Sequence, residues 1–296
     1  MQNWRSHCLE QEYPELLLLL GESGIGKTRL LEELANTLQN SGGYVLWGRG
    51  FEAEMLRPYG VWVDSFQAIG ATAFLDEMKS LVLNAKSAAD LNRGRLFDLA
   101  VQFIRPLANT APVLGVLDDL QWIDETSIAF FHYAMRLLRP PVPVWFACAA
   151  RKRDLEDNLP ADQLIQTLHR ERHLYTADLF PLDQAETLAL AQTIGSTMDG
   201  DRLFTSNGGN PLFALELLRA QVTGDSAAPD TLEMLIQGRL RQLDDAPRGL
   251  YYTAAKAARV AFPPRAKATG LPSSRFLSCW VLSSPGMRHN EELINK

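Results

Sequence analysis

Eight consecutive residues in this chain have the types and spacing to bind phosphate. They fit the pattern G-x-x-x-x-G-K-[ST] of a phosphate-binding loop and are Gly21, Glu22, Ser23, Gly24, Ile25, Gly26, Lys27 and Thr28. Glycines let the backbone turn tightly, so that its N–H groups can approach an anion. The motif predicts that Lys27 contacts the β- and γ-phosphates of a nucleotide and that the Thr28 hydroxyl ligates Mg²⁺.

The residues on either side of the loop have the order that this motif requires. Residues 16–20 are five leucines, which could be helix or strand, and an amphipathic stretch runs from Thr28 to about Gln39. A strand, the loop and then a helix would aim the positive end of the helix at the phosphates. This order favours phosphate binding over an ordinary glycine-rich turn.

Two adjacent carboxylates, Asp118 and Asp119, follow the apolar run at residues 113–117. A buried strand that ends in an acid places its carboxylate rigidly at the edge of a sheet. We therefore expect Asp118 to hold Mg²⁺, through water, and Asp119 to orient the attacking water. Adjacent Asp residues also occur in plain turns and helix caps, which is the alternative interpretation.

Arg151 directly follows a further apolar run, residues 142–149 and Ala150. Its guanidinium could contact a γ-phosphate and so report that ATP is present. An ordinary surface arginine in the basic turn of residues 151–153 is an equally good interpretation.

The apolar runs predict an α/β fold. Strands are expected at residues 16–20, 44–47, 113–117, 142–149 and 174–180, and helices at residues 58–69, 74–83 and 91–107. Short apolar runs separated by helices are typical of a buried parallel sheet flanked by helices. Ligands bind such sheets at the carboxyl ends of the strands, where Gly21, Asp118 and Arg151 would each follow a different strand. After Pro181 we expect only helices, at residues 182–194, 202–205, 211–222, 232–243 and 251–260.

The composition is that of an ordinary globular protein, with 296 residues, 46% of them hydrophobic and 22% charged. The net charge of −6 argues against direct DNA binding. Residues 247–296, however, hold eight Lys or Arg and two Glu, while residues 1–246 hold 21 basic and 33 acidic side chains. We interpret this basic tail as solvated rather than as a nucleic-acid contact.

The three cysteines, at positions 8, 148 and 279, offer neither a disulfide framework nor metal-binding spacing. No run is long enough for a signal-peptide core or a membrane span. We expect a cytoplasmic protein with no membrane partner.

Three phrases in this order carry a resemblance to a known family: residues 21–30, residues 117–124, and residues 209–213 with Glu216. They resemble the signal-transduction ATPases with numerous domains, which are related to the AAA+ proteins. The closest likeness is to the ATPase module of large ATP-binding regulators of the LuxR type, over roughly residues 14–260. The resemblance implies a phosphate-loop NTPase domain at residues 1–180, a helical lid at 181–246, and a partial winged-helix region or poorly ordered basic tail at 247–296.

The resemblance also implies residue roles and partners. ATP would bind between the α/β domain and the lid, with Arg29 among the loop's binding residues and Pro211 near the base. Arg151 matches a γ-phosphate sensor, and Lys27 and Asp119 would act in catalysis. Self-association in the ATP state is expected, and output or sensor domains would lie outside this chain. The GTPase motif Asn-Lys-x-Asp is absent, which favours adenine.

Three departures from the family affect the predicted rate of hydrolysis and the expected extent of the chain. Asp119 stands where many AAA+ enzymes have Glu, and its side chain is shorter by one methylene. The Gly-Arg segment that precedes the loop in relatives and helps hold the base is missing. Relatives also continue into a winged-helix segment and sensory repeats, or end in a DNA-binding helix-turn-helix, and this sequence completes neither, so we expect a fragment or a chain whose end has diverged. We predict an ATP-binding signal-transduction switch with slow Mg²⁺-dependent hydrolysis. The alternatives are an active AAA+ loader or motor, and an interaction or DNA-binding fragment that keeps the nucleotide fold.

Overall fold

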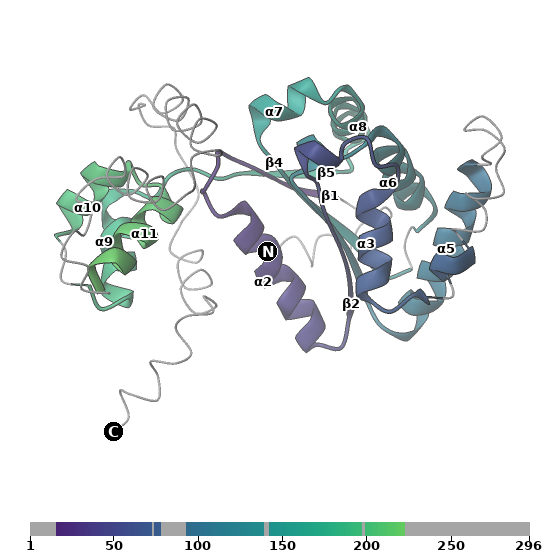
Figure 1. Cartoon of the computed structure of the whole chain (residues 1–296), viewed down its shortest axis with the longest axis horizontal. Coiled ribbons are helices and arrows are strands. Elements are labelled where there is room, and N and C mark those ends of the chain that lie inside the picture. The colour runs from purple at the N-terminus through teal and green to yellow at the C-terminus, as the bar shows by residue number, and fades with distance from the viewer. Residues whose placement is uncertain (1–15, 73, 78–92, 139–141, 197–198, 223–296) are drawn as a thin grey trace, which may run out of the picture. The chain divides into compact units, whose positions relative to one another are not determined.

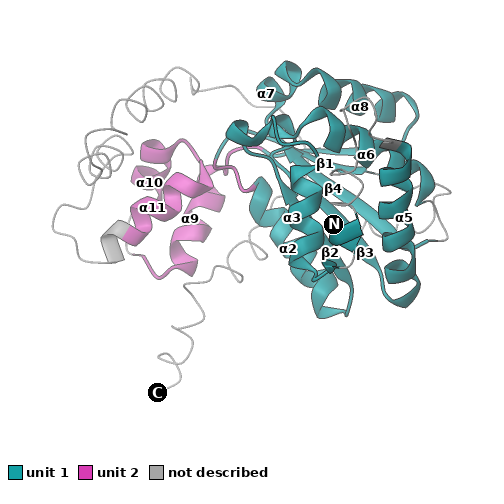
Figure 2. Ribbon diagram, turned by 45° about the vertical axis from the view of Figure 1, so that its right-hand side comes forward, with its two compact units in different colours: residues 1–23, 27–179 teal, residues 24–26, 180–296 magenta. Residues whose placement is uncertain are grey.

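The computed structural model describes residues 16–72, 74–77, 93–138, 142–196 and 199–222. These residues form two compact units (Figure 2). The first unit holds the described residues up to 179 except Gly24–Gly26, and the second holds Gly24–Gly26 and the described residues from 180 onward. Each unit is described by itself below.

A parallel sheet of five strands forms the centre of the first unit, in the order β2-β3-β4-β1-β5. The strands are β1 (Leu16–Leu20), β2 (Tyr44–Arg49), β3 (Val113–Asp118), β4 (Val144–Ala150) and β5 (Leu174–Asp178). All five expected strands are present, and every pairing is parallel, which confirms the predicted α/β fold. β4 begins at Val144 rather than at residue 142, because Pro143 has no N–H to donate to a neighbouring strand.

Helices cover both faces of this sheet (Figure 1). The helices of the first unit are α2 (Lys27–Asn40), α3 (Gly60–Ala68), α5 (Arg93–Thr110), α6 (Glu125–Leu137), α7 (Lys152–Asp157) and α8 (Leu159–Arg170). Two short 3₁₀ turns, η1 (Glu52–Glu54) and η2 (Leu120–Trp122), follow β2 and β3. The helix expected at residues 74–83 is helical over 74–77, and its remainder lies outside the described residues.

Alternating side chains of the strands separate the core into two layers. Leu17 and Leu19 pack with Leu31 and the other apolar residues of α2 on one face. Leu16 and Leu18 face the larger core formed by α3, α5, α6, α7 and α8. Because successive strand residues point to opposite faces, a run of five leucines serves both layers at once. The sheet is therefore buried on both sides and fixes the carboxyl ends of its strands.

The second unit contains α9 (Gln184–Thr193), α10 (Gly200–Asn207) and α11 (Pro211–Val222), which are three of the expected helices. A small core of Leu190, Leu203 and Leu217, among others, joins them. Gly24 groups with this unit, since its carbonyl accepts a hydrogen bond from the Leu212 N–H at 3.2 Å.

The helices expected at residues 232–243 and 251–260, and the winged-helix region or basic tail at 247–296, lie outside the described residues. None of the helices in the described part of the chain is long and apolar enough to cross a membrane.

Candidate functional site

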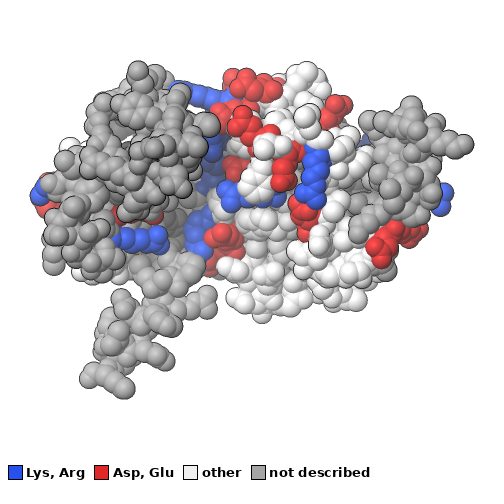
Figure 3. All heavy atoms as spheres, viewed as in Figure 1, with Lys and Arg blue, Asp and Glu red and all other residues white. Residues whose placement is uncertain are grey.

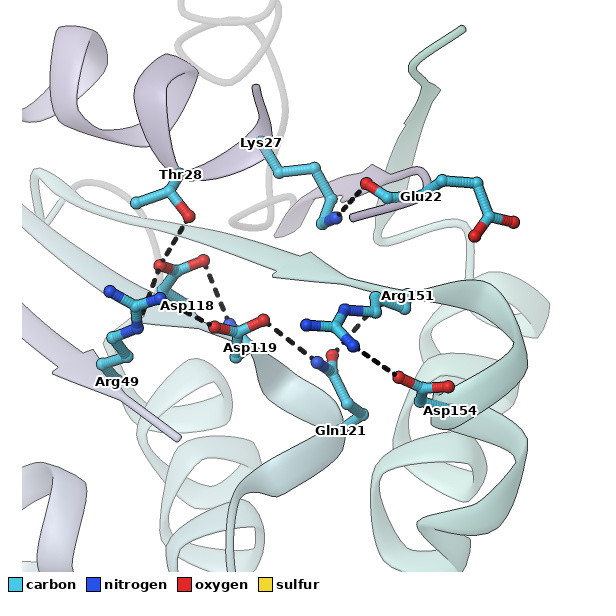
Figure 4. Close-up of polar contacts among 9 residues, drawn as sticks. All are labelled: Glu22, Lys27, Thr28, Arg49, Asp118, Asp119, Gln121, Arg151 and Asp154. Atoms are coloured by element: carbon cyan, nitrogen blue, oxygen red, sulfur yellow. Dashed lines mark hydrogen bonds and ion pairs between the residues drawn. The ribbon is translucent and has the colours of Figure 1, made fainter. Parts of the chain in front are cut away.

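The candidate residues of the first unit gather at the carboxyl ends of the strands (Figure 4). Gly21 follows β1, Asp118 ends β3, and Arg151 follows β4, which lies between those two strands in the sheet. Parallel pairing places these ends at the same edge, where such sheets bind ligands. The sheet thus brings together three positions that are far apart in the sequence.

The Lys27 side chain is hydrogen-bonded to the backbone of the phosphate loop. The Nζ ammonium donates hydrogen bonds to the carbonyl oxygens of Gly21 and Glu22, both at 2.9 Å. Only 7% of the residue is exposed. Burial, together with the nearby Arg151 guanidinium, lowers the pKa of Lys27. The site therefore contains two neighbouring cations that an anion would stabilise.

The loop backbone has the conformation that its glycines allow. Gly24 and Gly26 have φ angles of 77° and 101°, in the region where a residue with Cβ is strained. The helix α2 begins at Lys27, directly after this turn. The start of α2 therefore lies directly after the loop, and the N-terminal N–H groups of a helix are a common binding site for anions.

Thr28 and Asp118 are in direct contact, although 90 residues separate them. The Thr28 hydroxyl donates to Asp118 Oδ2 at 2.9 Å. Asp118 is completely buried, and this burial raises the pKa of its carboxyl. The charge of the adjacent Asp119 is the second cause of the raised pKa. Hydroxyl and carboxylate oxygens are ligands that suit Mg²⁺, so this pair fits the predicted metal role.

Asp119 has an unusual backbone conformation. Its φ and ψ are 53° and 52°, in the left-handed region, and it begins the η2 turn. Gly50 lies against it: a Cβ on Gly50 would be 2.6 Å from the Asp119 carbonyl oxygen, and the Gly50 N–H donates to the Asp118 carbonyl at 2.9 Å. The Asp119 side chain is 16% exposed, so water can reach its carboxylate.

Arg49 is a site residue that the sequence interpretation missed. Its Nη2 donates to Asp119 Oδ2 at 3.3 Å, and its Nε lies 3.8 Å from Asp118 Oδ2. Arg49 ends β2 and is paired in register with Asp118 on the neighbouring β3. The predicted strand ended at residue 47, and a strand two residues longer would have placed this arginine beside the carboxylates.

Gln121 is the second residue that was missed. Its Nε2 donates to Asp119 Oδ1 at 3.0 Å, and its Oε1 accepts the backbone N–H of Arg151 at 3.2 Å (Figure 4). The Arg151 guanidinium forms an ion pair with Asp154 at 3.3 Å, and its side chain is 38% exposed. The predicted sensor arginine is therefore connected to the second carboxylate through Gln121.

The remaining predicted residues are placed less centrally. Arg29, on α2, pairs with Glu32 at 2.8 Å and lies 3.9 Å from Glu33, so its charge is compensated within its own helix. Pro211 is the first residue of α11, in the second unit. Nucleotide contacts of Arg29 and Pro211 stay predictions.

A comparison with protein families finds that residues 7–148 match the model of an AAA ATPase domain. The matched range includes the phosphate loop and both aspartates, and it ends before Arg151. A comparison with curated proteins finds no match.

Several solved structures are similar to this chain in fold. The Aeropyrum pernix ORC2 protein, in ADPNP–ADP complexes, has a TM-score of 0.49 at 12% identity, over 94% of this chain and 82% of that chain. The A. pernix ORC1 protein in complex with DNA has a TM-score of 0.47 at 16% identity, over 98% and 81%. AMPPCP-bound DnaA from Aquifex aeolicus has a TM-score of 0.45 at 16% identity, over 75% of this chain and 60% of that chain.

Proposed function

We propose that this chain is an ATP-binding switch module that hydrolyses ATP slowly with Mg²⁺, as part of a signalling or transcriptional regulator. The observation that carries the proposal is the hydrogen bond of 2.9 Å between Thr28 Oγ1 and Asp118 Oδ2. It joins the phosphate loop to the acidic strand, and these two elements together are what Mg²⁺-dependent phosphoryl transfer needs. The match of residues 7–148 to an AAA ATPase domain supports the same class.

Each residue has a separate part in the proposed reaction. Lys27 and the N–H groups of the loop would bind the phosphates. Thr28, and Asp118 through water, would hold Mg²⁺, which would supply charge stabilisation for the transferred phosphoryl group. Asp119 orients the attacking water, and Arg151 contacts the γ-phosphate. Catalysis would depend on positioning and electrostatics rather than on a covalent intermediate.

The length of the Asp119 side chain supports slow turnover. One carboxylate oxygen accepts a hydrogen bond from Arg49 at 3.3 Å, and the other accepts one from Gln121 at 3.0 Å. A carboxylate offers about four acceptor sites, so these two donors still leave room for a water. The side chain is, however, shorter by one methylene than the Glu of many AAA+ enzymes, so it would hold this water less well. Slow hydrolysis suits a switch whose ATP state must last longer than that of a motor.

The test is calorimetric titration with ATP, ADP and GTP, each with Mg²⁺, beside a single-turnover hydrolysis assay. We expect tight binding of adenine nucleotides and measurable, slow turnover. Asp119→Asn should keep the affinity and lose hydrolysis by roughly 100-fold or more, as for other residues that orient the nucleophile. Asp162→Asn is the matched control, because the Asp162 carboxylate accepts a hydrogen bond from the exposed Gln166 of its own helix, α8.

Two results would contradict the proposal. Absence of nucleotide binding by the folded wild-type protein would remove the whole assignment. If Asp119→Asn turned over ATP at the wild-type rate, the proposed binding site would stand, but another group would have to orient the water.

A further inference from the structure

Gln121 is a buried amide whose two polar atoms are both used at the site. Only 1% of the residue is exposed. Its Nε2 donates to the Asp119 carboxylate at 3.0 Å, and its Oε1 accepts the Arg151 N–H at 3.2 Å. The residue therefore spans from the end of β3 to the residue that follows β4 (Figure 4).

The chemistry of its neighbours fixes the orientation of this amide. The Asp119 carboxylate oxygen accepts the hydrogen bond from Gln121, and the backbone N–H of Arg151 can only donate one. A flipped amide would place acceptor against acceptor and donor against donor. Only a side chain that carries one donor and one acceptor at this length satisfies both partners, and in this chain that is Gln121.

The backbone of Gln121 is held as well. Asn158, which is 4% exposed, donates from Nδ2 to the Gln121 carbonyl at 3.0 Å and to the Ile123 carbonyl at 2.9 Å. The Asn158 Oδ1 accepts the Ala161 N–H at the start of α8. A residue that is fixed at its backbone can transmit a restraint through its side chain.

We propose that Gln121 is a positioning residue that holds the Asp119 carboxylate in register with Arg151. In this arrangement the group that orients water and the residue that contacts the γ-phosphate occupy defined positions relative to each other. This inference rests on the proposed function for its catalytic consequence, whereas the contact itself can be measured without any reaction. A purely structural role would predict loss of stability or affinity instead of a selective loss of turnover.

Two substitutions separate the hydrogen bonds of Gln121. Gln121→Met keeps the length and removes both bonds, while Gln121→Glu keeps an acceptor for Arg151 and replaces the donor to Asp119 by a like charge. Gln166 provides the matched control, because its Nε2 also donates to an aspartate, Asp162, at 2.6 Å, on the exposed side of α8. Gln166→Met and Gln166→Glu change the same chemistry away from the site.

The reaction is measured as single turnover at saturating Mg²⁺-ATP, beside the dissociation constant from calorimetry. We expect both Gln121 variants to lose about 10- to 100-fold in turnover. Their dissociation constants should stay within about twofold of the wild-type value, as should turnover in both Gln166 variants. In an Asp119→Asn background, Gln121→Met should cause no further loss beyond about twofold, because both residues act on the same water.

The contact is measured by NMR, as hydrogen exchange of the Gln121 side-chain amide in the wild-type protein and in Asp119→Gly. Glycine accepts the left-handed backbone of position 119, so this variant removes the carboxylate without strain. Loss of the acceptor should speed the exchange of the Gln121 amide about tenfold or more, while the Gln166 amide stays unchanged. This experiment needs no folded Gln121 variant.

The outcomes separate this inference from the proposed function. Wild-type rates in folded Gln121 variants, a multiplicative loss in the double variant, or a loss of affinity equal to the loss of turnover would each overturn the positioning role. Unchanged exchange in Asp119→Gly would overturn the contact. A wild-type protein without turnover would overturn the proposed hydrolysis and with it the catalytic consequence, while the exchange data would still decide the contact.

Discussion

Replacement of Lys27 by methionine is the most informative single perturbation of this site. The change removes the ammonium group that donates to the Gly21 and Glu22 carbonyls but keeps an unbranched side chain of similar length. Because only 7% of Lys27 is exposed, water would compete little with bound phosphates for its charge. The variant therefore tests the charge rather than the packing.

The expected loss of ATP affinity follows from the proposed hydrogen bond between the Lys27 ammonium and the phosphates, which the variant cannot make. A hydrogen bond to a charged group contributes about 1.5–3 kcal/mol, which corresponds to a loss of about 10- to 150-fold in affinity for ATP. At an ATP concentration 100 times the wild-type dissociation constant, bound nucleotide raises the wild-type free energy of unfolding by about 2.7 kcal/mol. The same concentration should raise that of Lys27→Met by only about 0.3–1.4 kcal/mol.

Calorimetry and chemical denaturation, each with and without Mg²⁺-ATP, measure these two quantities. Lys152→Met is the control, because Lys152 is exposed on α7 and follows Arg151 directly. We expect the control to keep its affinity within about twofold. Unchanged ATP affinity in Lys27→Met would refute the assignment of residues 21–28 as the phosphate-binding loop.

Three further predictions follow from the geometry. Arg49→Met should tighten Mg²⁺ binding by up to about fivefold, because the Arg49 cation competes with Mg²⁺ for Asp118 and Asp119 and a half-exposed ion pair contributes at most about 1 kcal/mol. The affinity for Mg²⁺ is measured from the Mg²⁺ dependence of turnover. Weaker binding would mean that Arg49 supports the metal site. Gly50→Ala should lower the free energy of unfolding by about 1–3 kcal/mol and slow hydrolysis, because the new Cβ would lie 2.6 Å from the Asp119 carbonyl oxygen. A wild-type free energy of unfolding in chemical denaturation would contradict this close approach. The pKa of Lys27 is lower in the folded protein than in the unfolded chain, where it is about 10.5, so the unfolded chain keeps this proton to a higher pH. The free energy of unfolding without nucleotide should therefore rise with pH just below 10.5. Denaturation of Lys27→Met over the same pH range should lack this contribution.

The sheet could be predicted because its strands are apolar runs of the right length. Residues 16–20 alone were ambiguous between helix and strand, and the phosphate loop that follows them decided the matter. The ends of strands were harder, since Gly48 and Arg49 are not apolar but still pair with Leu117 and Asp118. Strand order also could not be read from the sequence, because β4 is inserted between β3 and β1 by tertiary packing.

The residues that the sequence did not reveal are those whose role depends on a neighbouring strand or turn. Arg49 reaches the carboxylates only because β2 pairs with β3 in one register. Gln121 reaches Asp119 and Arg151 only because Asp119 adopts a left-handed conformation and η2 turns the chain back. Arg49 belongs to none of the phrases that carry the resemblance, whereas Gln121 lies within one of them, residues 117–124, but was given no role there. The motifs therefore indicate the residues that we propose contact the nucleotide, but not the contacts that neighbouring strands and turns make with those residues.

The ion pair of Arg151 with Asp154 bears on whether this site could distinguish ATP from ADP. The two side chains are 38% and 32% exposed, so solvent screens their attraction and the pair contributes at most about 1 kcal/mol. A charge-assisted hydrogen bond to a phosphate is stronger, at about 1.5–3 kcal/mol. Arg151 could therefore leave Asp154 for a γ-phosphate with a net gain, whereas ADP would leave the pair in place. The Arg151 N–H donates to Gln121, which in turn donates to the Asp119 carboxylate. Such an exchange would therefore act on Gln121, and a γ-phosphate would affect the position of the carboxylate that we propose orients water.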